Sequence, residues 1–512
     1  MINIKEYFEE WERSECSKLT RQTIGTEETK AKRSYIHFDH RRPGSTVAHY
    51  RGIFINPDKL KTKIAFWPFL KIDLKEPRIK NAKKGYSRKK EVKERSVYFA
   101  AHQDALVYSW YSFCLNKFYE PLLKKLTIAE SVTAYRKIPQ TDDGKKNKCN
   151  IHFSKEVFDF VKNRKTDCAA LVADITGFFD NLDHDHLKNE WKRVLGLSAL
   201  DPFPEDHQII YDNLTRFKYA DAERVYKAFE IKFKTKKSKV HGKVKVFRIP
   251  TRGGKQIKHI LSSPFSRKDF VSRVVRGNLI QGNQNWNKEK RCHKGIMQGS
   301  PISATLANIY MLSFDKIITD LLSEMGGIYR RYSDDIVIVC DIKNYEVLRS
   351  RILDEIKKYQ LEINPSKTDA TFFIKNPDGI LVGRHAPNGD LKNMQYLGFE
   401  FDGRNIFIRP KSLTKYYRKM KSKVRKAVSM AFGKASKTKD RDNLVFKKSL
   451  YEKFIRKGKR SFISYALRSD KIMGGGTIKR QLSRRSKIMQ TYLSDRSKHK
   501  RFIKAKKNPS KT

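Results

Sequence analysis

The segment 329–340 reads YRRYSDDIVIVC, which places two adjacent aspartates between two strand-like runs. The aromatic and β-branched residues on both sides predict two strands joined by a tight turn. Adjacent carboxylates repel each other, and burying either one without a partner costs several kcal/mol. Asp334 and Asp335 therefore need solvent, hydrogen bonds or a cation. A plain polar turn is the alternative, because aspartate is common in turns.

The charge of the chain is far from balanced. Its 512 residues, enough for roughly two to four domains, include 110 Lys and Arg against 55 Asp and Glu, a net charge of +55. Residues 411–512 hold 34 Lys or Arg and 5 Asp or Glu, a net +29. This excess predicts a polyanionic partner, with nucleic acid as the natural candidate. A basic soluble surface or an anionic membrane is the alternative. Copies of the chain would repel one another, so we expect any homo-oligomer to assemble with its nucleic acid.

The cysteines predict neither a disulfide framework nor a structural zinc site. The chain has six scattered cysteines and no CxxC pair. Cys149 with His152 would be half of a ligand set, and no second half is visible. The N-terminus lacks the pattern of a signal peptide, and no apolar run is long enough to span a membrane. We therefore expect reduced thiols in a cytoplasmic protein without a membrane partner.

Hydrophobic patterns predict several elements around these features. The apolar run 168–173 predicts a buried strand that ends at Asp174. Residues 95–137 show helical periodicity, and residues 411–432 predict an amphipathic helix that Gly433 would end. In NLDHDHL, His184 and His186 could be metal ligands. A helix start capped by Asp183 or Asp185 is the favoured interpretation.

Five motifs resemble, in order, those of a reverse transcriptase palm. They are Asp174-Ile-Thr-Gly-Phe-Phe179, Gln298-Gly299-Ser300-Pro301, Tyr332-Ser-Asp334-Asp335, Leu361-Glu-Ile-Asn364 with Lys367, and the primer-grip hairpin at Tyr396, Leu397 and Gly398. Their order across residues 174–402 makes the resemblance far more specific than YSDD alone.

The resemblance implies a two-metal site for nucleotidyl transfer. Asp174, Asp334 and Asp335, with the backbone carbonyl of Ile175, would hold two Mg²⁺ ions, with Mn²⁺ as an alternative. One ion would activate the attacking hydroxyl and the other would stabilise the leaving phosphate. Lys367 would supply a proton or charge to the leaving pyrophosphate, although an ordinary surface lysine is the alternative.

The resemblance also implies a nucleotide site. Phe179 corresponds to the steric gate that excludes a ribose 2′-hydroxyl, although an aromatic core residue would look the same. Gln298, Gly299 and Ser300 would lie against the incoming nucleotide and template. Arg95 would meet the triphosphate, since its guanidinium fork suits phosphate. A buried ion pair, for example with Glu94, is the alternative for Arg95.

The implied fold class is α+β, a right-hand polymerase. An antiparallel palm sheet flanked by helices would carry the site, next to fingers and a basic, mainly helical thumb or C-terminal region. The expected domains are an N-terminal extension with part of the fingers (1–94), fingers (95–165), palm (166–410, with an insertion at about 190–290) and the basic RNA-binding region (411–512).

The fingers sequence ERSVYFAAHQDALVYSWYSF resembles bacterial reverse transcriptases of the abortive-infection and defence-associated kind. This implies an RNA-directed DNA polymerase in antiphage defence, which makes DNA from dNTPs on a dedicated structured non-coding RNA. Protein priming by a tyrosine is known in that group, and Tyr492 is one candidate.

Three other functions stay open. A retron or group II intron-type reverse transcriptase is disfavoured, because no HNH endonuclease is recognised after residue 411. An RNA-dependent RNA polymerase is disfavoured by Phe179. A catalytically silent RNA-binding protein is disfavoured by the presence of all three aspartates.

Overall fold

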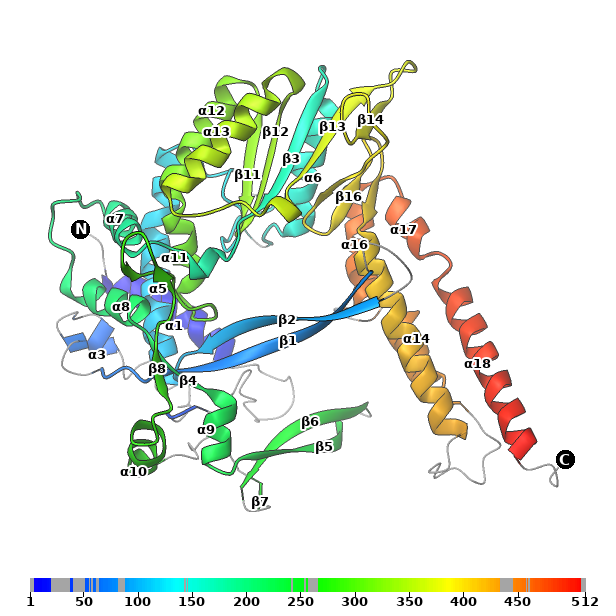
Figure 1. Cartoon of the computed structure of the whole chain (residues 1–512), viewed down its shortest axis with the longest axis horizontal. Coiled ribbons are helices and arrows are strands. Elements are labelled where there is room, and N and C mark those ends of the chain that lie inside the picture. Colours follow the sequence, from blue (N-terminus) through cyan, green and yellow to red (C-terminus); the bar gives the residue numbers. More distant parts are fainter. Residues whose placement is uncertain are drawn as a thin grey trace. The chain divides into compact units, whose positions relative to one another are not determined.

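In the computed structural model the chain forms two compact units, each assembled from separate segments of sequence. The first unit comprises Met1–Tyr135, Ile175–Ile318 and Leu353–Glu362, and the second comprises Arg136–Asp174, Thr319–Ile352 and Ile363–Thr512. The structure describes residues 4–19, 37–39, 51–54, 56, 59–60, 64–81, 88–141, 144, 146–240, 243–252, 255–256, 266–432, 445–456, 458 and 461–507. Figure 1 labels most of their helices and strands.

The first unit combines a four-stranded sheet, a β-hairpin extended by a short strand, and helices. Its described elements are α1 (Ile4–Leu19), α3 (Arg51–Phe54), β1 (Phe69–Asn81), β2 (Arg88–Phe99), α5 (His102–Lys125), η1 (Phe178–Asp180), α7 (His184–Val194), α8 (Glu205–Thr215), β4 (Lys218–Asp221), α9 (Ala222–Ala228), β5 (Lys232–Val240), β6 (Lys243–Arg252), β7 (Lys255–Gln256), α10 (Arg267–Phe270), η2 (Val271–Val275), β8 (Ile280–Gly282), β9 (Trp286–Asn287), β10 (Cys292–His293), α11 (Ser303–Tyr310) and α12 (Leu312–Glu324), which begins in this unit. The sheet has the order β2-β1-β4-β8, and β5, β6 and β7 pair separately.

The β1–β2 hairpin corrects one prediction from the sequence. The helix expected from residue 95 onward begins at His102, because the preceding residues complete the ladder of β2 with β1. In that ladder Arg95 pairs with Leu74 and Phe99 pairs with Leu70. The helical spacing of the apolar residues holds within α5, where they form a buried face, but it does not extend into the alternating residues before it.

The second unit is built on a five-stranded antiparallel sheet in the order β11-β12-β3-β13-β14. Its described elements are α6 (Asn150–Asn163), β3 (Cys168–Asp174), β11 (Ile328–Tyr332), β12 (Asp335–Asp341), η3 (Ile342–Asn344), α13 (Tyr345–Lys358), which begins in this unit, η4 (Pro365–Lys367), β13 (Asp369–Lys375), β14 (Leu381–Arg384), β15 (Met394–Tyr396), β16 (Phe399–Phe401), β17 (Ile406–Ile408), α14 (Pro410–Phe432), α15 (Lys448–Phe454), α16 (Phe462–Met473), α17 (Thr477–Leu482) and α18 (Arg485–Lys507). This α+β composition agrees with the predicted fold class.

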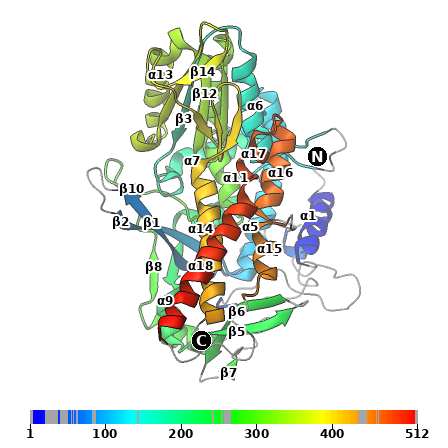
Figure 2. The same ribbon diagram turned by 90° about the vertical axis from the view of Figure 1, so that its right-hand side faces the viewer.

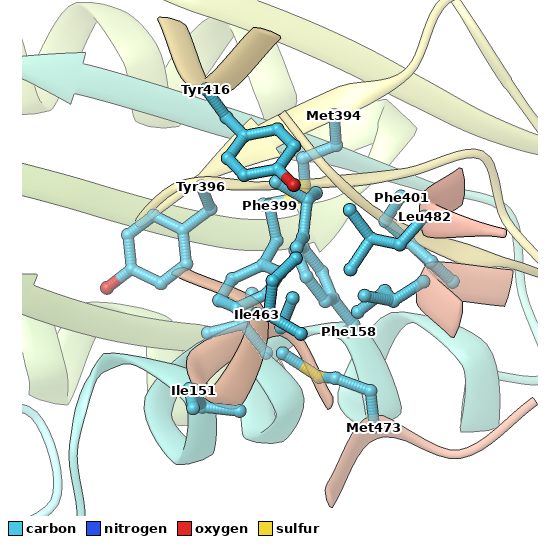
Figure 3. Packing of buried hydrophobic residues seen from close by; sticks show 14 of the residues in the cluster. Ile151, Phe158, Met394, Tyr396, Phe399, Phe401, Tyr416, Ile463, Met473 and Leu482 are labelled. Carbon is cyan, nitrogen blue, oxygen red and sulfur yellow. The ribbon is translucent and has the colours of Figure 1, made fainter. Parts of the chain in front are cut away.

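One hydrophobic core joins the sheet of the second unit to the C-terminal helices. Phe158 of α6 stacks on Phe401 of β16, with ring centroids 5.1 Å apart. Figure 3 shows Tyr416 of α14, Ile463 of α16 and Leu482 of α17 in the same cluster. Burying each such apolar side chain contributes about 1.5–3 kcal/mol relative to leaving it exposed. The basic C-terminal region is therefore an integral part of this unit rather than a detached tail.

The amphipathic helix predicted for 411–432 is confirmed as α14. Met420, Val424 and Val428 are buried in the core, as the spacing predicted, and the lysines and arginines between them are exposed. Gly433, the predicted end, lies outside the described residues.

One smaller prediction, the capped helix start at Asp183, is also confirmed. Asp183 caps α7 by accepting the backbone N–H of His186, and the Nε2 atoms of His184 and His186 lie 2.8 and 2.9 Å from the carbonyl oxygens of Gly295 and Tyr310. All cysteines whose side chains are described are free. Within the described part of the chain, every helix is too short or too polar to cross a lipid bilayer.

Candidate active site

Asp174 and the adjacent pair Asp334 and Asp335, far apart in sequence, lie at one end of the five-stranded sheet. Asp174 is the last residue of β3 and Asp335 the first residue of β12, and the antiparallel ladder pairs them directly. Directly paired residues share one face of a sheet, with Cβ atoms about 4.5–5.5 Å apart. Asp334 precedes Asp335 in the turn from β11, so all three lie within the second unit.

The turn that carries Asp334 is short and constrained. Tyr332 of β11 pairs with Asp335 of β12, which leaves only Ser333 and Asp334 between the strands, as the sequence predicted. Ser333 adopts a left-handed backbone with φ +63°, which costs a non-glycine residue of order 1 kcal/mol. The fully buried Arg331 donates from Nη1 to the Ser333 carbonyl at 3.2 Å. This contact holds the strained residue in place.

Asp335 is in an environment that disfavours its charge. Burial raises the pKa of Asp335 to about 6, and the neighbouring charges of Asp334 and Asp174 act in the same direction. Lys367 and Arg409 oppose these effects without cancelling them. A site of this kind stores electrostatic repulsion that a bound cation would relieve.

Lys367 is ion-paired with Asp174 through Nζ and Oδ1. The 3₁₀ turn η4 carries the lysine, and the backbone N–H of Asn364 donates to the Asp174 carbonyl at 2.8 Å. These two contacts therefore hold the fourth motif, with Asn364 and Lys367, next to Asp174 of the first motif. About half of the Lys367 side chain is exposed, so its ammonium can leave the carboxylate.

The three carboxylates offer the type of donor atom that a hard divalent cation binds. Carboxylate oxygens are the ligands that Mg²⁺ prefers, and burial together with the charges of Asp334 and Asp174 raises the pKa of Asp335. Among the described residues, however, no three His, Cys, Asp or Glu side chains converge closely enough to hold a metal ion. Lys367 engages one oxygen of Asp174 instead. Ile175, whose carbonyl was the fourth expected ligand, follows Asp174 directly and is buried.

The residues expected to bind nucleotide lie in the first unit. Phe179 is half-buried in η1, and its carbonyl accepts the N–H of Ile296 at 2.9 Å. This bond ties the first motif to the residues just before Gln298. Ser300 is buried, and its Oγ has no hydrogen-bond partner among the described residues.

Gln298 and Gly299 are fixed against β2, the strand of Arg95. The backbone N–H of Tyr98 donates to the Gln298 carbonyl at 2.8 Å. Gly299 has φ +118°, and a Cβ there would lie 2.7 Å from Cγ1 of Val97, so only glycine fits. Arg95 is exposed on the same strand. The structure thus fixes Gln298 and Gly299 against the strand that also carries Arg95.

The proposed primer-grip residues form a tight turn between β15 and β16. Leu397 and Gly398 have φ +44° and +94°, as required at both central positions of a type I′ turn. Asn150 donates from Nδ2 to the Leu397 carbonyl at 3.1 Å. Tyr396 is a core residue whose hydroxyl has no partner among the described residues, and burial raises its pKa.

Sequence reasoning missed Arg331 and Asn150. Arg331 could have been found from the alternation in YRRY, which puts it on the same buried face as Tyr329. Asn150 had no local signal, because its partners Leu397 and Tyr465 lie far away in the sequence.

Residues 231–401 match the sequence model of a family described as reverse transcriptase (RNA-dependent DNA polymerase). The matched segment contains Gln298, Gly299, Ser300, Asp334, Asp335, Lys367, Tyr396, Leu397 and Gly398. It begins after Asp174 and Phe179, but the ladder between β3 and β12 connects Asp174 to the matched part. No curated protein matches the chain.

Solved structures that align with the chain include telomerases. Apo telomerase from Candida tropicalis, truncated from the C-terminal domain, aligns at 10% identity over 71% of this chain and 60% of that chain, with a TM-score of 0.35. Telomerase from Candida albicans in complex with a TWJ fragment of telomeric RNA aligns at 12% identity over 88% and 65%, with a TM-score of 0.33. The chain spans about 60% of the length of the first of these proteins. Neither alignment indicates the bacterial defence subtype.

The family match covers the second, third, fourth and fifth motifs, and the structure adds the first aspartate at the position paired with Asp335. Residues 231–401 are therefore similar to the reverse transcriptase (RNA-dependent DNA polymerase) family model.

Proposed function

We propose that the protein extends a primer with dNTPs on a structured non-coding RNA and acts in antiphage defence. The observation that carries the polymerase part is the direct pairing of Asp174 with Asp335, next to Asp334 in its two-residue turn. The defence role rests on the resemblance of the fingers sequence alone. In this proposal the second unit supplies the palm sheet and the thumb, and β1, β2 and α5 belong to the fingers.

The three aspartates and Lys367 have different roles in nucleotidyl transfer. Asp174, Asp334 and Asp335, with the Ile175 carbonyl, would hold two Mg²⁺ ions. When bound, these ions supply charge that activates the primer hydroxyl and neutralises the leaving pyrophosphate. Lys367 adds a positive charge beside Asp174, where the leaving group develops its negative charge.

In this proposal, residues of the first unit select the nucleotide. Arg95 would contact the triphosphate from β2, and the unpartnered Ser300 Oγ would accept or donate one hydrogen bond to the nucleotide. Gly299 lets the chain approach β2 closely. Phe179 would place its ring against the sugar.

Phe179→Ala is expected to admit ribonucleotides. Removing the ring opens space for a 2′-hydroxyl, so the ratio of kcat/KM for rNTP over dNTP should rise by about 10- to 100-fold. Single-nucleotide primer extension with dNTPs and rNTPs in separate reactions measures this ratio. Phe179→Tyr keeps the ring and should keep the discrimination. If the ratio is unchanged in Phe179→Ala, Phe179 is not the steric gate. If the wild type prefers rNTPs, an RNA-dependent RNA polymerase is favoured.

A basic groove on the C-terminal helices fits an RNA backbone. Helices α14 and α18 lie side by side, as Figure 2 shows, and an open groove of about 590 Å³ is lined there by Lys421, Arg484 and Lys487. The ring of Tyr492 lies 5.4 Å from Lys421 Nζ and 5.5 Å from the Arg496 guanidinium. Cations beside an aromatic face suit a phosphate backbone with a stacked base.

Reversing the charge of this groove is expected to weaken RNA binding. The variant Lys421→Glu/Arg484→Glu/Lys487→Glu should bind structured RNA about 10- to 100-fold more weakly near physiological salt, with a salt slope shallower by about 2–3. Fluorescence anisotropy across a salt series measures both. Truncation after Arg409 would be less informative, because it removes core residues such as Met420.

The matched control reverses three exposed charges elsewhere in the chain. Lys343→Glu/Arg349→Glu/Lys357→Glu changes the net charge equally but lies on η3 and α13. If both variants lose the same affinity, the groove is not an RNA site and net charge alone drives binding.

Tyrosine priming is a further part of the proposal. Tyr492 is half-buried, and Arg496 Nε donates to its hydroxyl at 3.3 Å. A DNA product that separates from the protein under denaturing conditions would exclude this route.

A silent RNA-binding protein is the second candidate. The ion pair of Lys367 with Asp174 favours it, because the carboxylate is neutralised without a metal. The Asp335 variant described in the Discussion separates the two functions.

A further inference from the structure

An exposed tryptophan lies on the short β9–β10 hairpin of the first unit, and no role has yet been given to it. Trp286 is 48% exposed, whereas Trp11 and Trp191 are buried. The ladder pairs Trp286 with His293, which is also exposed, and their rings meet edge to face with centroids 4.9 Å apart. Tryptophan is enriched where proteins contact partners, because its ring offers a large, flat contact area. The hairpin therefore presents an aromatic surface to solvent.

Hydrogen bonds fix the loop and the base of this hairpin. Asn287 is buried, and its Oδ1 accepts the backbone N–H groups of Glu289 and Lys290 at 3.0 and 3.1 Å. At the base, the backbone N–H of Lys294 donates to the Asn285 carbonyl at 3.1 Å. Because the loop is already ordered, little conformational entropy has to be lost when a partner binds to the indole.

The hairpin is anchored to the residues that follow the first motif. The backbone N–H of Gly295 donates to the Leu182 carbonyl at 2.7 Å, and Lys290 Nζ donates to the buried Asp183 carboxylate at 2.6 Å. A Cβ on Gly295 would lie 2.5 Å from the Asp180 carbonyl oxygen, so only glycine permits this close approach. The hairpin is therefore held next to the residues proposed to bind the nucleotide.

The charge around Trp286 is strongly positive. Residues 286–294 contain four lysines or arginines and one acidic residue, Glu289. Lys288 and Arg291 are exposed, whereas Lys290 is ion-paired with Asp183. Lysine is depleted in the cores of protein–protein interfaces. An aromatic ring with cations beside it suits a single nucleic-acid strand, because the base stacks on the ring and the phosphates meet the cations.

The base that meets Trp286 must be unpaired. Within a duplex both faces of a base are covered by its neighbours, so an indole can stack only on an unpaired or terminal base. The hairpin ends at His293, and the second motif begins five residues later at Gln298. In the proposed function, Gln298 and Gly299 lie against the incoming nucleotide and the template. The unpaired part of the template strand is therefore the occupant that fits this place.

We propose that Trp286 stacks on an unpaired base of the strand that serves as template, and that Lys288 and Arg291 contact its phosphates. His293 supports the indole from the paired strand. Stacking itself requires only an unpaired base. The assignment of that base to an RNA template rests on the proposed function.

The first test measures binding of the full-length protein without dNTPs. The probe is an RNA–DNA hybrid with an unpaired 5′ overhang on the RNA strand, and a blunt hybrid is the comparison. Trp286→Ala should weaken binding of the overhang hybrid about tenfold and leave the blunt hybrid within twofold. Its salt slope should not change, because no charge is removed. Lys288→Gln/Arg291→Gln should weaken overhang binding and make the slope shallower by about 1. Fluorescence anisotropy across a salt series measures all three.

Two further variants separate stacking from a general loss of aromatic surface. Trp286→Phe keeps a ring and should retain most of the overhang affinity. Phe446→Ala removes a ring that is 65% exposed in the second unit and should leave the preference for overhangs unchanged. With 2-aminopurine at the first unpaired position, binding of the wild type should quench its fluorescence, and binding of Trp286→Ala should not. Equal quenching in both, or equal weakening of overhang and blunt hybrids, would overturn the proposal.

The remaining outcomes distinguish this inference from the proposed function. In buffer with a metal chelator, Asp335→Asn should bind the overhang as tightly as the wild type, although it should not make DNA. If Trp286→Ala keeps both overhang affinity and DNA synthesis, the stacking proposal is wrong and the polymerase function stands. If the loss occurs only with DNA overhangs, the assignment to an RNA template is wrong. If Trp286→Ala changes only the oligomeric state, the surface joins copies of the chain instead.

Discussion

Asp335→Asn is expected to abolish DNA synthesis while making the fold more stable. The amide has the shape of the carboxylate but not its charge, so cation binding and synthesis should fall by about a thousandfold or more. Burial and two neighbouring carboxylates raise the pKa of Asp335 from 3.8 to about 6. At about 1.4 kcal/mol per pKa unit, the ionised group lowers the free energy of unfolding by about 2–3 kcal/mol at neutral pH.

The pH dependence of the free energy of unfolding shows whether the ionised Asp335 stabilises or destabilises the fold. In buffer with a metal chelator, the stability of the wild type should fall as pH rises from about 4 to about 6, because the unfolded carboxyl ionises before the folded one. Asp335→Asn should lack this decline. Added Mg²⁺ should raise the Tm of the wild type and leave that of the variant nearly unchanged. Denaturant titrations and primer extension measure the two properties.

Asp341→Asn is the matched control, since Asp341 ends the same strand. The Thr166 hydroxyl and Arg164 hold the pKa of Asp341 below its ordinary value. Its loss should therefore reduce stability and preserve synthesis. If Asp335→Asn makes DNA at the wild-type rate, the carboxylates are not catalytic and the silent RNA-binding function is favoured.

Arg331→Leu is expected to have the largest effect on stability among single substitutions near the turn. Its side chain is fully buried, and removing the guanidinium leaves the Ser333 carbonyl without that donor. Losing a buried charged donor costs about 3 kcal/mol. Because Ser333 holds a left-handed conformation, the turn should relax and synthesis should fall even where the variant is folded.

Arg331→Lys tests the geometry of that contact. A lysine keeps the charge but not the planar fork, so we expect intermediate stability and activity. Arg349→Leu, an exposed change on α13, should shift the unfolding free energy by less than about 0.5 kcal/mol. Unchanged Tm and full synthesis in Arg331→Leu would show that the turn holds its shape without the arginine.

Local patterns predicted the elements that depend on neighbours in sequence. The run 168–173 predicted β3 up to Asp174, and the apolar spacing of 411–432 predicted α14 almost to the residue. The expected helix from residue 95 was wrong at its start, because strand pairing with β1 decides that segment. The hydrophobic periodicity of a short segment does not reveal a strand partner that lies elsewhere in the chain.

For the candidate site, the sequence predicted which residues matter but not how they are held. The order of motifs brought Asp174 and Asp335 together in the prediction, and the ladder pairs them directly. The ion pair of Lys367 with Asp174 and the buried Arg331 were not predicted. Each depends on a tertiary contact, and lysines and arginines are so abundant here that composition cannot select the one that is buried.

The division of the chain into interleaved segments has a consequence for its synthesis. The first unit lacks its last segment until Glu362 has left the ribosome, although that unit begins at the N-terminus. The second unit begins at Arg136 and needs segments up to the C-terminus. Neither unit can therefore be completed before the other has partly emerged, and no single cut yields two folding halves. During synthesis the long, strongly basic nascent chain therefore stays incompletely folded. We expect slow folding that depends on chaperones or on early binding of nucleic acid.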